Sequence, residues 1–133
     1  MDIQNSYRKI IEIMKNILEE IAARTRERIA KEKTCISVSE LENRIQEVNK
    51  NARQKITFLQ ALQKDGMSYI CEVKKASPSK GLIAPDFPYL AIAKEYEQAG
   101  ASAISCLTEP FYFQGADQYL REISAAVQIP VLR

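Results

Sequence analysis

The chain has 133 residues, a length that fits one domain, and 46% of them are hydrophobic, which is enough for a packed core. Charged residues make up 27%, but the net charge is only +2, which argues against the strongly basic face that a nucleic-acid partner requires. No stretch approaches the roughly 20 consecutive apolar residues of a membrane span, and residues 1–11 lack the apolar core of a signal peptide. We therefore expect a cytoplasmic protein with neither a nucleic-acid nor a membrane partner.

The cysteine and histidine content limits the chemistry further. Cys35, Cys71 and Cys106 have no metal-type spacing and are typical of reduced thiols in a reducing compartment. The sequence contains no histidine, so the commonest general base and the commonest zinc ligand are both missing. Any chemistry must therefore depend on lysine, glutamate and aspartate side chains.

The first half of the chain has the pattern of helices. Residues 6–64 are rich in charged and helix-forming residues and contain no proline. Apolar residues recur at every third or fourth position, which is the period of an amphipathic helix, and predict one long helix over residues 6–32. The residues that carry this pattern are Ile10, Ile13, Met14, Ile17, Leu18, Ile21, Ala22 and Ile29.

Two shorter helices are expected next. Ser37 or Ser39 can cap the second helix, because a serine hydroxyl accepts a hydrogen bond from a free backbone amide at a helix start. A third helix is expected over residues 58–64 and ends in turn-forming residues at Asp65 and Gly66. The buried side of the second helix would consist of Leu41, Ile45 and Val48.

The second half alternates between strands and helices. Short β-rich runs at residues 69–74, 103–108 and 129–132 predict strands, and helices are expected over residues 89–99 and 116–127. A strand–loop–helix unit thus occurs twice and begins a third time, which is typical of α/β proteins with parallel strands, either a doubly wound sheet or a (βα)8 barrel. A complete barrel needs about 200–250 residues, so we expect the polypeptide to be a truncated part of one.

The first strand end carries the strongest candidate site. Glu72 and Lys74 lie two residues apart on a strand, so both side chains point to the same face. Ser77, Ser79 and Lys80 follow in the next loop, and together these groups suit a pocket for an anionic sugar or a carboxylate. The alternative interpretation is a structural ion pair followed by an ordinary exposed turn, with Lys75 and Lys80 solvated or supporting the loop.

The second strand end supplies a carboxylate and aromatic rings. Glu109 is a candidate polar residue of the pocket, and three consecutive aromatic residues follow at positions 111–113. One of these rings can stack on an aromatic substrate, whereas Phe111 and Tyr112 are expected to serve as packing. Cys71 and Cys106, on the predicted strands, are expected to be small core residues.

Several of these segments resemble the indole-3-glycerol phosphate synthase family. The run Tyr-Ile-Cys-Glu-Val-Lys-Lys-Ala-Ser-Pro-Ser-Lys-Gly-Leu-Ile at residues 69–83 is similar to the hallmark segment of that family. Leu-Thr-Glu at residues 107–109 and Tyr-Phe-Gln-Gly at residues 112–115 resemble its next segment, and residues 130–133 resemble the strand that leads into a Lys-Asp-Phe motif. The resemblance extends from about residue 14 to residue 133.

The resemblance implies a fold and a division of the chain. The expected fold is a partial (βα)8 TIM barrel that comprises the first two βα units and the start of the third strand. A helical segment at residues 1–66 would precede the barrel portion at residues 67–133.

The resemblance also implies an activity. The family is a carboxy-lyase of tryptophan biosynthesis that needs no metal or cofactor. It converts 1-(2-carboxyphenylamino)-1-deoxyribulose 5-phosphate, an anionic phosphosugar–anthranilate, into indole-3-glycerol phosphate, carbon dioxide and water. By motif position, Lys74 would be a catalytic lysine near the substrate carboxylate and Glu72 the carboxylate that orients it. Ser77, Phe113 and Glu109 would bind the substrate.

The sequence also departs from the family pattern. The lysine of the Lys-Asp-Phe motif, a later glutamate and asparagine, and the phosphate-binding loops do not occur in these 133 residues, so we expect the chain to be inactive alone. A non-catalytic half-barrel that self-associates through exposed strands is an alternative. Another phosphosugar barrel enzyme, such as a phosphoribosylanthranilate isomerase, is a further alternative, but it does not account for the Glu-Val-Lys-Lys-Ala-Ser-Pro-Ser run.

Overall fold

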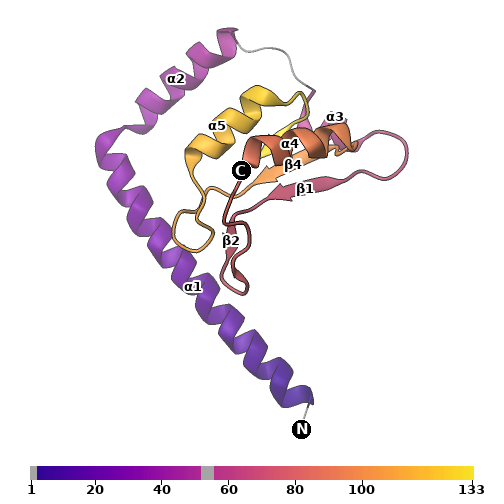
Figure 1. The fold of residues 1–133 in the computed structure, drawn as a ribbon. Helices are drawn as coiled ribbons and strands as arrows, with labels where there is room; N and C mark the ends of the chain where they lie inside the picture. Colours follow the sequence, from indigo (N-terminus) through magenta and orange to yellow (C-terminus); the bar gives the residue numbers. More distant parts are fainter. Residues whose placement is uncertain (1–2, 52–55) are drawn as a thin grey trace. The chain divides into compact units, whose positions relative to one another are not determined.

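The structure, a computed structural model, describes residues 3–51 and 56–133 and is drawn in Figure 1. The chain divides into two compact units, Met1–Arg53 and Gln54–Arg133. Among the described helices, none is both long enough and apolar enough to cross a membrane.

The first unit begins with α1 (Ile3–Cys35), which confirms the predicted long helix and extends it at both ends. Its carboxyl end continues past the expected stop because the amide of Ile36 still donates to the carbonyl of Glu32, at 3.0 Å. The pairs Glu20–Arg24 and Arg28–Glu32, each four residues apart, lie along the surface of the helix. Of the apolar residues that carry the helical pattern, Ile17, Ile21 and Ala22 are half-buried and Leu18 and Ile29 are exposed. The side chains of Ile10, Ile13 and Met14 fall outside the described part.

The second helix, α2 (Val38–Asn51), starts where the sequence predicts. Ser37 is its cap, because the Ser37 hydroxyl oxygen accepts a hydrogen bond from the amide of Glu40 at 3.2 Å. The prediction of a buried apolar side was wrong. Leu41, Ile45 and Val48 expose 47%, 58% and 67% of their surface, because helical spacing creates an apolar face but does not supply a surface to cover it.

The second unit begins with α3 (Phe58–Leu62), two residues shorter than predicted. Its start is fixed by a capping box: the Thr57 hydroxyl accepts from the Gln60 amide, and the Gln60 side chain accepts from the Thr57 amide at 2.8 Å. After α3, Gly66 adopts a φ of 91°, which a residue with a side chain rarely takes.

Three parallel strands form the sheet of this unit. They are β1 (Ile70–Val73), β4 (Ala103–Cys106) and β5 (Val131–Leu132), in the order β1-β4-β5. β1 and β4 lie side by side in Figure 1, with Glu72 opposite Ser105, and Ser105 is in turn opposite Leu132. The parallel α/β pattern predicted for residues 69–132 is therefore confirmed, with each strand shorter than expected.

Two helices cover one face of this sheet. α4 (Tyr89–Gln98) connects β1 to β4, and α5 (Asp117–Ala126) connects β4 to β5. The helices contact each other and the strands, and a continuous core lies between the two layers. The buried members of that core are Val73, Ala93, Ile104, Cys106, Ile123 and Val127.

The loop after β1 contains a small hairpin that the sequence did not predict. β2 (Ala76–Ser77) pairs antiparallel with β3 (Gly81–Leu82), so that Ser77 lies opposite Gly81. The carbonyl of Lys75 accepts hydrogen bonds from the amides of Ile83 and Ala84, at 2.9 and 3.2 Å, which closes the base of the hairpin. Strands of two residues carry no alternation of polar and apolar side chains, so their sequence does not distinguish them from a loop.

Candidate functional site at the carboxyl end of the sheet

Glu72 and Lys74 form an ion pair at the carboxyl end of β1. The Lys74 ammonium bonds to the Glu72 carboxylate, and their side chains are 31% and 44% exposed, respectively. Val73 between them points into the core and is 1% exposed, so the pair occupies the opposite, open face of the sheet. The shared face inferred from the spacing of these residues is therefore confirmed, and the pair is accessible to a ligand.

Ser77 lies one step further along the same loop. Its hydroxyl oxygen accepts a hydrogen bond from the amide of Lys80 at 3.2 Å, which fixes the turn of the hairpin. A serine hydroxyl that accepts a bond in this way can still donate its own hydrogen to a second acceptor. The Lys80 side chain is exposed, as expected for a residue that supports the loop.

Glu109 makes contacts that sequence reasoning missed. Its Oε1 accepts a hydrogen bond from the amide of Phe111 at 3.0 Å, and its Oε2 accepts from the amides of Tyr112 and Phe113, at 2.6 and 3.2 Å. The carboxylate therefore bonds to three successive amides of its own loop. The signal in the sequence was a glutamate directly before Pro110, followed by three residues whose backbone amides can donate, but this signal is weak without the backbone geometry.

The two loops meet through Phe113. Its carbonyl accepts a hydrogen bond from the amide of Ala76 at 3.2 Å, which brings the loop after β4 against the start of the hairpin, one residue from Ser77. Phe113 and Tyr112 are half-buried. Phe111 exposes 57% of its surface, which is more than the expected packing role predicts.

Gly115 and Arg133 fix the other end of the loop. A Cβ on Gly115 would lie 2.3 Å from the carbonyl oxygen of Leu107, so only glycine fits there. Arg133, directly after β5, donates to the Thr108 hydroxyl and to the Asp117 carboxylate, both at 2.9 Å. The loop is thus attached to β4, to the first residue of α5 and to the end of β5.

Three side chains of the second unit have shifted pKa values. The Tyr89 hydroxyl donates to the Glu122 carboxylate at 2.6 Å, which raises the pKa of Tyr89 and lowers the pKa of Glu122. Burial raises the pKa of the Cys106 thiol, in agreement with the expected role of Cys106 as a core residue. Cys71 is half-buried and Cys35 is exposed, and all three cysteines are free thiols.

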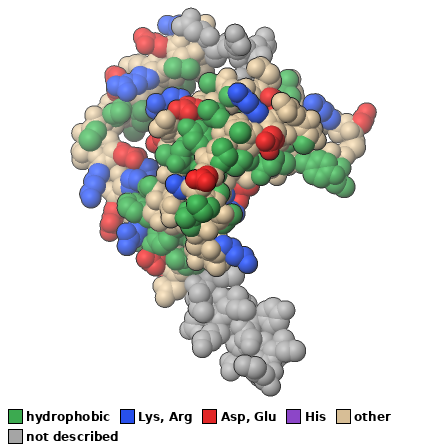
Figure 2. Space-filling view, viewed as in Figure 1, with side chains coloured by type: hydrophobic (Ala, Val, Ile, Leu, Met, Phe, Trp, Pro, Cys, Tyr) green, Lys and Arg blue, Asp and Glu red, His purple; other side chains and the backbone are tan. Residues whose placement is uncertain are grey.

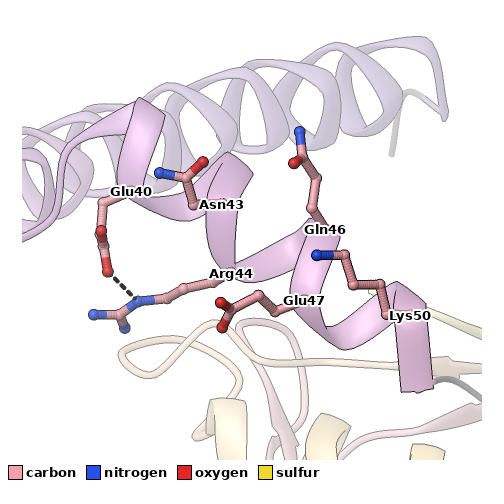
Figure 3. A pocket seen from close by; sticks show the side chains of 6 residues that line it. All are labelled: Glu40, Asn43, Arg44, Gln46, Glu47 and Lys50. Atoms are coloured by element: carbon pink, nitrogen blue, oxygen red, sulfur yellow. Dashed lines mark hydrogen bonds and ion pairs between the residues drawn. The ribbon is translucent and has the colours of Figure 1, made fainter.

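A shallow hollow in the helical unit carries no comparable chemistry. Figure 3 shows that its six lining side chains all come from α2, with Arg44 Nε bonded to Glu40 Oε1 at 2.9 Å. Acidic and basic groups alternate there along a single solvated helix, which favours a surface role. Across the described residues, no three His, Cys, Asp or Glu side chains are grouped closely enough to hold a metal ion. The lining residues are Glu40, Asn43, Arg44, Gln46, Glu47 and Lys50.

The fold and the site together define a class of protein. It is a parallel α/β protein whose charged and aromatic side chains gather where the strands end, the usual place for ligands in such sheets. A sequence profile described as indole-3-glycerol phosphate synthase matches residues 18–133. The chain belongs to the indole-3-glycerol phosphate synthase family.

Curated relatives agree with this assignment. The chain is 50% identical over 117 residues to an indole-3-glycerol phosphate synthase of Lacticaseibacillus paracasei and 49% identical over 118 residues to one of Ruminiclostridium cellulolyticum. It is 51% identical over 117 residues to one of Endomicrobium trichonymphae. Each match covers 88% of this chain but only 44–45% of the relative, so the chain spans less than half the length of these proteins.

Proposed function

We propose that this chain supplies the amino-terminal side of the active site of an indole-3-glycerol phosphate synthase, a carboxy-lyase of tryptophan biosynthesis. The substrate would be 1-(2-carboxyphenylamino)-1-deoxyribulose 5-phosphate, which closes into indole-3-glycerol phosphate with loss of carbon dioxide and water. Family membership supports this proposal, and so do the names of the relatives. It replaces the alternative of a phosphoribosylanthranilate isomerase.

The observation that carries the proposal is the Glu72–Lys74 pair on the open face of the sheet. An ammonium group at this position would hold the substrate carboxylate and stabilise the negative charge that develops during ring closure and decarboxylation. Glu72 would keep the ammonium oriented. Lys74 and Glu72 are therefore the proposed catalytic residues, and a purely structural ion pair is the interpretation that experiment must exclude.

Ser77 and Phe113 are the proposed substrate-binding residues. Ser77 would donate its hydroxyl hydrogen to the anionic substrate, and the Phe113 ring would form part of the pocket for the anthranilate ring. Both lie on loops that meet at the hydrogen bond between Ala76 and Phe113. Glu109 was expected to contact the substrate as well, but its bonds to three amides of its own loop favour a different role.

The proposed fold is the first part of a (βα)8 barrel at residues 67–133, preceded by a helical extension at residues 1–66. The sheet order β1-β4-β5 supports this proposal, because each new strand is added next to the previous one in the same direction. The position of both helices on one face of the sheet supports it too. The 133-residue chain is expected to turn over substrate poorly, because correct orientation by a complete site contributes about 7–11 kcal/mol.

Titration of the substrate into the chain, followed by calorimetry, tests the role of Lys74. We expect Lys74→Met to weaken binding at least tenfold, because it removes the cation that faces the substrate carboxylate. Lys94→Met is the matched control, since Lys94 is an exposed lysine on α4. Equal affinities of the two variants would contradict the proposal. Fluorescence of indole-3-glycerol phosphate measures turnover, and rapid turnover by the 133-residue chain would contradict the expected inactivity.

A second candidate function is self-association. Within the described residues β1 and β5 each pair only with β4, so each has one strand edge without a partner strand. Ile70 and Leu132 are about half exposed on the open face. On the side of the molecule drawn in Figure 2, hydrophobic side chains also reach the surface, among charges of both signs. Light scattering over a range of protein concentrations tests this candidate, and a mass that stays at the monomer value would exclude it.

A further inference from the structure

The loop after β4 has an unusual backbone conformation. Gln114 adopts a φ of 50°, in the left-handed region that residues with side chains rarely occupy. The amide of Gly115 donates to the carbonyl of Glu109 at 2.8 Å, so the loop folds back on itself within a few residues. A strained conformation of this kind persists only when the surrounding contacts determine it, and such residues cluster at functional sites.

The contacts that determine this conformation come mainly from one side chain. The Glu109 carboxylate accepts hydrogen bonds from three successive amides, of Phe111, Tyr112 and Phe113, at 2.6–3.2 Å. Hydrogen bonds to an ionised acceptor are about twice as strong as neutral ones. The carboxylate acts as an internal anion for these amides, which satisfies them without a ligand.

The same contacts set the position of Phe113 relative to the hairpin. The Phe113 amide bonds to Glu109, while its carbonyl accepts from the Ala76 amide at 3.2 Å. The Phe113 backbone is therefore held by hydrogen bonds at both its amide and its carbonyl, and the carbonyl bonds to Ala76, the residue before Ser77. Loss of the Glu109 bonds would release Phe113 and remove one of the contacts that join the two loops.

We propose that Glu109 is a positioning residue of the site, which holds the Phe113 backbone, and with it the ring, beside the hairpin that carries Ser77 and does not itself bind the substrate. This inference rests on the proposed function, because Phe113 is taken there to receive the anthranilate ring. It replaces the substrate contact that the sequence suggested for Glu109. The substrate would depend on Glu109 only through the loop.

Glu97 offers a matched control. Its carboxylate also accepts hydrogen bonds from backbone amides, in this case those of Gln128 and Ile129, at 2.6 and 3.0 Å. These amides precede β5, at the amino end of the sheet and away from the site. Glu109→Gln and Glu97→Gln therefore make the same chemical change at opposite ends of the strands.

Amide hydrogen exchange and NMR chemical shifts of the 133-residue chain test the structural part. We expect Glu109→Gln to speed exchange of the Tyr112 and Phe113 amides at least tenfold and to shift the Ala76 amide, since one charged acceptor is lost. Glu97→Gln should affect Gln128 and Ile129 instead. If the Gln variant does not fold, Glu109→Asp should give the same pattern at a smaller amplitude, because its carboxylate is one methylene shorter. Unchanged exchange and shifts in the loop would overturn the proposal.

Titration with anthranilate as the probe tests the functional part. We expect anthranilate to shift the NMR signals of the Phe113 ring in the unaltered chain and in Glu97→Gln. We expect its affinity, measured from the same signals, to be at least tenfold lower in Glu109→Gln. Weaker binding with an unchanged loop would make Glu109 a direct ligand and overturn the positioning role. If anthranilate does not perturb Phe113 in the unaltered chain, the proposed binding role of Phe113 fails, and the exchange data still decide whether Glu109 holds the loop.

Discussion

The two ends of the parallel sheet use carboxylates in different ways. At the amino end, the Glu97 carboxylate accepts hydrogen bonds from two backbone amides of the connection between α5 and β5 and so stabilises that connection. At the carboxyl end, Glu109 fastens a loop in the same manner, but Glu72 pairs with a lysine on the open face of the sheet. The Glu97 contacts hold the fold together at the amino end, whereas the carboxyl end combines such contacts with groups that a ligand can reach. This division agrees with the general placement of active sites in βα folds.

The largest expected effect is that of Gly115→Ala at the carboxyl end. The added Cβ would lie 2.3 Å from the Leu107 carbonyl oxygen and 2.7 Å from backbone atoms of Thr108, so the backbone must move. We expect a loss of about 3 kcal/mol in the free energy of unfolding, the upper end for overpacking. Urea denaturation followed by circular dichroism measures the loss.

Gly66→Ala is the control for this prediction, near the amino end of β1. A Cβ on Gly66 would meet nothing within 4 Å, although its φ of 91° is unfavourable for alanine. The expected cost is about 1 kcal/mol. Similar losses of unfolding free energy in the two variants would mean that the close packing of Gly115 against the Leu107 carbonyl is not needed for the loop conformation.

The next largest effect is that of Glu97→Gln at the amino end. This substitution removes a charged acceptor from the amides of Gln128 and Ile129, and we expect it to lower the free energy of unfolding by about 2 kcal/mol. Glu95→Gln, an exposed glutamate on the same helix, should change stability little. If substrate binding weakens in Glu97→Gln while the carboxyl-end loops stay unchanged, the proposed division between the two ends is wrong.

A smaller effect on stability is expected for Lys74→Met. The Glu72–Lys74 pair is partly exposed, and water and salt screen such pairs, so its loss should cost less than about 1 kcal/mol. The same variant is expected to lose most of its affinity for substrate. Thermal unfolding beside the binding titration separates the two quantities, and a large loss of stability would favour the purely structural ion pair.

The smallest effect concerns the start of α4, which lies toward the carboxyl end of the sheet. The bond from Tyr89 lowers the pKa of Glu122 below its usual 4.5 and raises the pKa of Tyr89 above its usual 10.0. Because Glu122 has a lowered pKa in the folded chain, its contribution is present above pH 4.5 and is lost as the pH falls through the folded value. The Tyr89 contribution is present below pH 10.0 and is lost as the pH rises through its folded value.

Tyr89→Phe should therefore lower the melting temperature slightly near neutral pH, and the difference from the unaltered chain should shrink in acid. Melting temperatures of the two chains, recorded between about pH 3 and pH 8 with all other conditions constant, measure this difference. Tyr119→Phe retains the Tyr89–Glu122 bond and serves as the control in the same aromatic cluster. A constant difference across the whole range would mean that Glu122 is not the titrating partner.

Sequence patterns predicted those parts of the structure that repeat with a regular period. The three parallel strands and the helices between them follow from alternating β-rich and amphipathic segments. The shared face of Glu72 and Lys74 follows from the two-residue period of a strand. In each case the side-chain direction depends on secondary structure alone.

Other parts depended on contacts that no local pattern encodes. The role of Glu109 depends on the left-handed backbone of Gln114 and on the distant amide of Ala76. The hairpin of β2 and β3 is too short to show a period. The apolar stripe of α2 was expected to be buried, but burial needs a second surface, and the spacing of Leu41, Ile45 and Val48 gives no information about one.

The order of the strands also has a consequence for how the chain folds. Ile70 pairs with Ala103, and Ile104 pairs with Val131, so each strand joins the one that precedes it in the sheet after a single helix has been made. Each parallel pair forms slowly, because the entropy of closing the intervening loop and helix is lost before the strands make their contacts. A ribosome releases the chain from its amino end, and domains commonly begin to fold during synthesis. The unit formed by β1, α4, β4 and α5 can therefore assemble in the order of translation, with the Glu72–Lys74 pair placed before β5 has been made.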